Sequence, residues 1–92
     1  MEKTIHESYR TDKFFRYGTF EQFLRENGFK EAIKEDSSNP KYYIWNFKGA
    51  TVFYTMREGL MRDHTKITIS GEEDNVGEVE RLIMAEKLRQ NS

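Results

Sequence analysis

Hydrophobic residues are concentrated in short runs in the middle of this 92-residue chain, and glycine separates the runs. The run Lys41–Phe47 is rich in aromatic residues, which favour β-sheet. In Ala50–Met56 and Lys66–Ser70, valine, isoleucine and aromatic residues stand at alternate positions, the spacing of a strand with one buried face. We therefore expect three strands, over 41–47, 50–56 and 66–70, that form an antiparallel meander.

Helical spacing comes before this meander. Phe20, Phe23 and Leu24 fall at positions i, i+3 and i+4, so they form one apolar stripe. Thr19 and Gln22 have the spacing of a capping box, and Asn27-Gly28 is typical of a left-handed C-terminal cap. The pattern predicts a helix over 20–27.

A second helix is expected after the meander, over 75–90. Asn75 and Glu78 have the spacing of another capping box. Acidic residues at the start and basic residues at the end suit the helix dipole. The expected buried stripe consists of Val76, Val79, Leu82, Ile83 and Leu88.

Two segments have weaker patterns. Residues 29–36 fit either a strand or a second helical stretch, and we favour a strand because Gly28 breaks the preceding helix. Residues 1–12 fit an N-terminal arm or a short strand. We expect residues 13–90 to form a single domain and residues 91–92 to fray.

Together these elements predict a two-layer α+β domain. Its antiparallel sheet has three to four strands, and two helices cover one sheet face in the order helix–meander–helix. The strand over 41–47 is nevertheless apolar on both sides, because Tyr42 and Ile44 point to one face and Trp45 points to the other. In the next strand, Phe53 points to the face opposite that of Val52. Either the aromatic segment 13–18 covers the second face, or that face is an ordinary tyrosine-rich sheet surface, or it is a binding or dimer surface.

Composition adds a constraint on function. Aromatic residues make up 14% of the chain and supply a core in a sequence that is only 36% hydrophobic. The net charge of −1 argues against a protein that works mainly by neutralising phosphates. Basic residues predominate between Lys41 and Lys66. The segment from Gly71 to Glu80 instead contains five acidic residues and no basic ones.

Candidate chemistry is sparse. The chain has no cysteine, and its two histidines, His6 and His64, lack a metal-binding or nucleophile motif around them. No glycine-rich phosphate loop is present, so we expect no enzyme activity, no catalytic residues, no metal and no cofactor. The N-terminus does not look like a secretory leader and no apolar run approaches ~20 residues, so a cytoplasmic protein without a membrane partner is expected.

The expected order of a helix, three strands and a helix is similar to that of the double-stranded-RNA-binding fold, which HicA-type toxin ribonucleases share. The stretch FLRENGF, Phe23 to Phe29, resembles the opening helix and glycine of those toxins. The toxins carry a histidine on their first hairpin, where this chain has Ser38 to Tyr42. The resemblance therefore implies a shared topology at most.

The leading hypothesis is a non-enzymatic small binding protein, an inhibitor or regulator of the phage or mobile-element type, that acts by protein–protein contact. The partner is either a different protein or a second copy of the chain, as a homodimer through the sheet face. The candidate contact residues are Tyr42, Ile44, Phe53, Glu72, Glu73 and Asp74. The alternative is a nucleic-acid-binding domain that uses sheet aromatics and basic residues, namely Lys41, Tyr43, Trp45, Lys48, Arg57 and Arg62.

Overall fold

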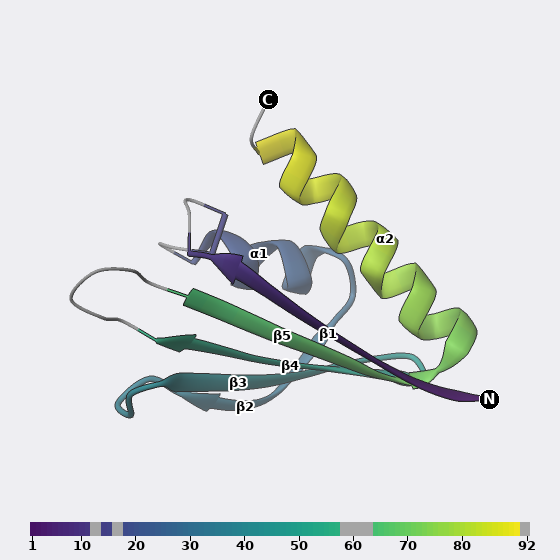
Figure 1. Ribbon diagram of the computed structural model, residues 1–92, viewed down its shortest axis with the longest axis horizontal. Coiled ribbons are helices and arrows are strands. Elements are labelled where there is room, and N and C mark those ends of the chain that lie inside the picture. The colour runs from purple at the N-terminus through teal and green to yellow at the C-terminus, as the bar shows by residue number, and fades with distance from the viewer. Residues whose placement is uncertain (12–13, 16–17, 58–63, 91–92) are drawn as a thin grey trace.

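The computed structural model describes residues 1–11, 14–15, 18–57 and 64–90, and it is α+β as expected. All strands in these ranges belong to one antiparallel sheet with the order β1-β5-β4-β3-β2. Both helices lie on the same face of that sheet (Figure 1). The elements are β1 (Glu2–Arg10), α1 (Thr19–Glu26), β2 (Lys30–Glu35), β3 (Lys41–Phe47), β4 (Ala50–Arg57), β5 (His64–Glu72) and α2 (Glu73–Gln90).

The strand count and the element order differ from the sequence prediction. The described sheet has five strands instead of three to four, because the N-terminal residues form the nine-residue edge strand β1. This strand pairs with β5 along its whole length, from Glu2 opposite Glu72 to Arg10 opposite His64. The chain therefore begins with a strand, and the helix–three-strand–helix order of the double-stranded-RNA-binding fold is not what the structure has.

The start of α1 also differs from the prediction. Gly18 occupies the N-cap position in a left-handed conformation with φ 76°, and no side chain caps the helix there. Thr19 is the first helical residue, so the expected capping box is wrong. The amide of Gln22 instead donates to the Glu26 carboxylate one turn further on, at 2.8 Å.

The end of α1 matches the prediction. Asn27 is the C-cap and Gly28 has φ 86°, which glycine adopts at little steric cost. The backbone N–H of Phe29 donates to the carbonyl of Leu24 at 3.0 Å, as in a Schellman motif. This turn directs Phe29 into the core and starts β2, which confirms the strand assignment for residues 29–36.

Helix α2 begins at Glu73, two residues earlier than predicted, so Asn75 lies inside the helix and does not cap it. Val76, Val79 and Ile83 are buried as expected. Leu88 is 70% exposed, and its predicted place in the buried stripe is wrong. Figure 1 shows the reason, because the C-terminal turns of α2 extend away from the sheet.

The core lies between the sheet and the helices. Phe14 packs against Phe20 and Phe23 with ring centroids 5.1 and 5.7 Å apart, and Phe20 meets Tyr54 of β4 edge-on at 4.9 Å. Phe14 and Phe15 therefore lie on the helix side of the sheet. These two aromatic residues do not cover the second face, although coverage by this segment was one of the alternatives left open by the sequence.

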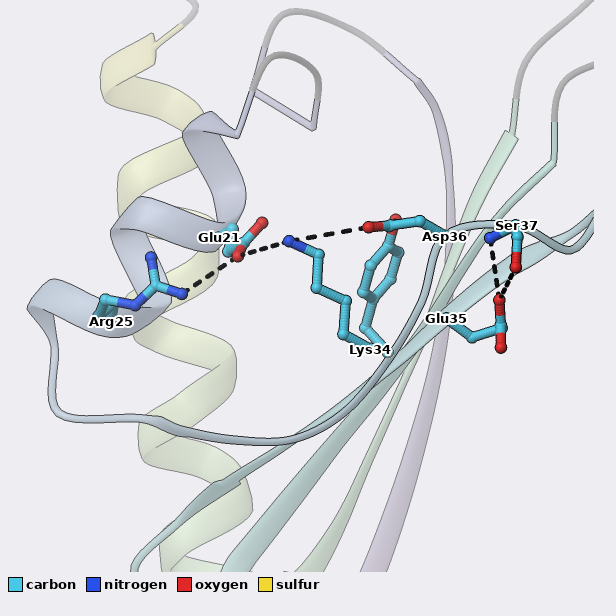
Figure 2. Close-up of polar contacts among 7 residues, drawn as sticks. Glu21, Arg25, Lys34, Glu35, Asp36 and Ser37 are labelled. Atoms are coloured by element: carbon cyan, nitrogen blue, oxygen red, sulfur yellow. Dashed lines mark hydrogen bonds and ion pairs between the residues drawn. The ribbon is translucent and has the colours of Figure 1, made fainter.

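A polar network ties the edge strand β2 to α1 (Figure 2). The Glu21 carboxylate accepts hydrogen bonds from Arg25 at 3.1 Å and from Lys34 at 3.3 Å. Lys34 also lies 3.8 Å from the Asp36 carboxylate, to which the Tyr43 hydroxyl donates at 2.6 Å. The hydrogen bond and the charge of Glu21 raise the pKa of Lys34.

Candidate functional site

The sheet face that points away from α1 and α2 is the candidate site, and we call it the open face. Strand register aligns one residue from each strand in a central row across it, which consists of Ile33, Ile44, Phe53, Thr68 and His6. Ile33 is 46% exposed and Phe53 is 37% exposed. Within the described part of the chain, no helix covers this face (Figure 1).

A β-bulge places Ile33 in this row. Glu31 pairs with Trp45, and the next registered pair is Ile33 with Ile44, so Ala32 is the extra residue. Without the bulge, Ile33 would point to the same side as Glu31, which is the helix side. The bulge therefore joins Ile33 to the apolar side chains of Ile44 and Phe53.

Tyr42 completes the apolar part of the open face, and it is 38% exposed. It lies one row from Ile44, between Glu35 of β2 and Thr55 of β4. The hydroxyl and the backbone N–H of Ser37 donate to the Glu35 carboxylate and lower its pKa. Figure 2 shows Glu35 and Ser37 together, apart from the Lys34–Glu21 contact.

Charges of opposite sign stand at the two ends of the open face. At one end, Arg57 pairs with His64 and His64 pairs with Arg10, and Lys66 lies in the next row. At the other end, Glu2 pairs with Glu72. The central row, which contains Ile44, Phe53 and Thr68, lies between the basic end and the acidic end.

The predicted protein-binding residues lie in two places on the surface. Tyr42, Ile44 and Phe53 are brought together on the open face. Glu72 is at its acidic end, where the Met1 amino group donates to the carboxylate at 3.1 Å and lowers the pKa of Glu72. Glu73 and Asp74 follow in the first turn of α2 and are exposed.

The residues of the nucleic-acid alternative are dispersed. Tyr43 and Trp45 are only 5% and 1% exposed and point into the core, so they are not available to stack on bases. Lys48 lies over the Phe47 ring and 3.5 Å from the Glu78 carboxylate.

Of the other basic residues, Lys41 pairs with Met56 and belongs to the same side of β3 as Tyr43, which is the helix side. Arg57 lies on the open face, and Arg62 lies outside the described residues.

Sequence reasoning missed Ile33, Lys66 and Arg10 as members of the open face. The alternation of residues in β5 was a signal that could have identified Lys66. The place of Arg10 on the face depends on the pairing of β1 with β5, and that of Ile33 depends on the bulge.

The two histidines lie on the open face. Nδ1 of His6 is 3.1 Å from the Thr68 hydroxyl, and His64 stands between two arginines. Among residues 1–11, 14–15, 18–57 and 64–90, no group of three or more histidine, aspartate or glutamate side chains is arranged to hold a metal ion. The same residues contain no helix that combines the length and hydrophobicity needed to cross a membrane.

Comparisons with known proteins add no family or function. No protein-family model, no curated protein and no solved structure matches the chain. The functional argument therefore rests on the geometry and the chemistry of the open face.

Proposed function

We propose that this chain is a non-enzymatic binding protein that acts by contact between its open face and a protein partner, either a different protein or a second copy of this chain. The observation that supports this proposal is the apolar group at the centre of the face, in which Ile33, Tyr42 and Phe53 are exposed and Ile44 is half-buried. A sheet that faces only water normally alternates buried apolar residues with polar ones. Strands β3 and β4 depart from that rule at the same place.

The distribution of side chains on this face resembles that of a protein interface. Such interfaces have an apolar centre that is rich in aromatic residues and a polar rim that stays in contact with water. Here Tyr42 and Phe53 are central, and Glu35, Arg57 and Lys66 lie around them. Tyrosine in such a position contributes hot-spot contacts at low conformational cost, so the face suits an inhibitor or regulator that works by occupying a surface.

The face is also held in shape before any partner binds. In the sheet, β4 has two strands on each side. The Glu21–Lys34 contact also fixes the edge strand β2 to α1. A pre-formed face loses little conformational entropy on binding. This supports recognition by the face as it stands.

A second candidate function is the binding of single-stranded nucleic acid at the basic end of the same face. The observation in its favour is that Arg57 and Lys66 are on the open face near the exposed rings of Tyr42 and Phe53, with Arg10 farther along at the same end. Aromatic rings stack on bases and neighbouring cations neutralise phosphates. This set differs from the one expected from the sequence, because among the expected residues that the structure describes only Arg57 lies on the face.

Capture from cell lysate with immobilised protein tests the two candidates. The test variant is Tyr42→Ser with Phe53→Ser, and the matched control is Leu88→Ser, which removes an exposed apolar side chain far from the open face. We expect wild type and control to retain the same proteins at low and high salt, and the test variant to lose them while circular dichroism stays unchanged.

Equal capture by all three proteins, together with the same oligomeric state for all three, would overturn the protein-binding proposal. Retention of nuclease-sensitive material that falls steeply as salt rises would favour the nucleic-acid candidate instead. Single-stranded oligonucleotides of mixed sequence then serve as the direct probe. An Arg57→Ala variant should weaken their binding if the basic end is responsible.

A further inference from the structure

We propose that the partner of the open face is a second copy of this chain, stacked face to face about a twofold axis that runs across the strands along the central row. This inference rests on the proposed function, because it names the protein that the face binds. It follows from how the side chains of the face are placed relative to that row.

The apolar side chains are self-complementary about this axis. A twofold axis brings the same surface of both copies together, and residues on the axis meet their own counterparts. Ile33, Ile44 and Phe53 all lie in the central row, so each packs on itself. Their exposed surface is thereby covered by surface of the same kind.

The charged side chains are complementary about the same axis. The rotation reverses the strand direction, so a row on one side of the centre meets the row at the same distance on the other side. Arg10 and Glu2 are each four residues from His6 in β1, in opposite directions, so Arg10 of one copy faces Glu2 of the other. In β5, the imidazole of His64 faces the Glu72 carboxylate, to which a ring N–H can donate a hydrogen bond.

The row next to the centre gives further matched pairs. Glu35 lies one row to one side and Lys30, across the bulge, one row to the other, so these opposite charges meet between copies. Tyr42 and Asn46 are related in the same way in β3, and their hydroxyl and amide groups are suited to hydrogen bonding.

The other twofold axis that stacks the two faces runs parallel to the strands, and it fits less well. An axis along β4 would place Ile44 on Thr68 and Ile33 on His6, which leaves apolar side chains against polar ones. It would also place Arg57 on its own counterpart, and this repulsion between like charges is unfavourable. The side chains therefore select the axis across the strands.

The area of the face is sufficient for a specific contact. Five strands about 4.8 Å apart and up to nine residues long at about 3.4 Å per residue span roughly 20 by 30 Å. Two such faces remove roughly 1,200 Å² or more from water, which is at the lower end for specific complexes. We therefore expect a dimer with a dissociation constant in about the micromolar range.

Sedimentation equilibrium over a wide concentration range tests the dimer, and charge exchange tests its axis. Arg10 and Glu2 stand at opposite ends of β1, about 27 Å apart, so they do not interact within one copy. Arg10→Glu alone and Glu2→Arg alone should each raise the dissociation constant about tenfold, because each creates two like-charge contacts. The double variant should restore it to within a few-fold of wild type.

Phe53→Ser should also abolish the dimer, and Leu88→Ser should leave it intact. A wild type that is monomeric at every concentration overturns the inference, and so does a double variant no better than the single ones. A dimer that persists in Phe53→Ser points to pairing of the strand edges and also overturns it. If the protein is monomeric but still captures another protein through Tyr42 and Phe53, the proposed function stands without the dimer; if that capture is lost as well, both fail.

Discussion

Replacing Gly71 by alanine tests how closely β5 approaches the turn between β3 and β4. A Cβ atom at Gly71 would lie 2.1 Å from the carbonyl oxygen of Gly49 and 2.8 Å from Cα of Ala50. The φ angle of Gly71 is +138°, a conformation that residues with a side chain rarely adopt. The residue that follows donates its N–H to the same carbonyl oxygen, at 3.2 Å.

The expected cost has two parts. The backbone conformation costs about 1–3 kcal/mol for a residue other than glycine. The clash is with backbone atoms, so the strands must separate at this end of the sheet, which adds about 1–3 kcal/mol. A domain of this size has a free energy of unfolding of roughly 5–14 kcal/mol, so Gly71→Ala should remove a large share of it. The melting temperature should fall by about 10–30 °C.

Gly28→Ala is the matched control, because Gly28 has φ +86° and a Cβ there would meet nothing within 4 Å. It should cost only the conformational part, about 1–2 kcal/mol. Urea unfolding of both variants, followed by circular dichroism, gives the two free energies. If Gly71→Ala loses no more stability than Gly28→Ala, the close approach of the backbones does not stabilise the fold and the reasoning is refuted.

Three further predictions concern single side chains. Ser37→Ala should raise the pKa of Glu35 in an NMR titration, because one of the two hydrogen bonds that lower this pKa is lost, and an unchanged value would contradict the contact. Ile83→Ala should cost about 2–5 kcal/mol in urea unfolding and Leu88→Ala less than about 0.5 kcal/mol, because the first is 2% exposed and the second 70%. Burial raises the pKa of the Tyr54 hydroxyl above its value in the unfolded chain. The neutral hydroxyl therefore contributes its full stability below about pH 10, and this contribution is lost as the pH rises further. Tyr54→Phe removes the titrating group, so its free energy of unfolding should fall less steeply with pH above about pH 10.

The central meander could be predicted from the sequence because the signals for it are local. Dense aromatic and β-branched residues define β3, β4 and β5, and glycine or proline separates the strands. The predicted limits fall within two residues of the observed ones. The apolar stripes of α1 and the first turns of α2 were equally clear, since helical spacing requires no knowledge of the partner surface.

The sequence left residues 1–12 as either an arm or a short strand, because the pairing of β1 depends on residues about sixty positions away. Its side chains are mostly polar, with Ile5 and Tyr9 as the half-buried apolar positions that face the helix side. The charge distribution of the open face was missed for the same reason. Arg10 and Glu2 acquire their places only when β1 lies against β5.

The open face was predicted in part. The alternation in β3 and β4 was sufficient to place Tyr42, Ile44 and Phe53 opposite the core. Ile33 was not identified, because a bulge changes the side to which a residue points and the sequence of β2 does not mark it. Alternation alone would have assigned Ile33 to the side of Glu31.

The contrast between strands of the same sheet is the strongest argument that the open face binds something. In β5 the outward positions are all polar and include Lys66, Thr68 and Ser70, as expected for a strand in contact with water. In β3 and β4 the corresponding outward positions include Ile44 and Phe53, although both strands already place large side chains in the core. A sheet whose second face had only to be solvated would have the pattern of β5 throughout. Apolar residues grouped on one face are typical of interaction surfaces, so this contrast between strands supports the proposal that a partner covers the open face.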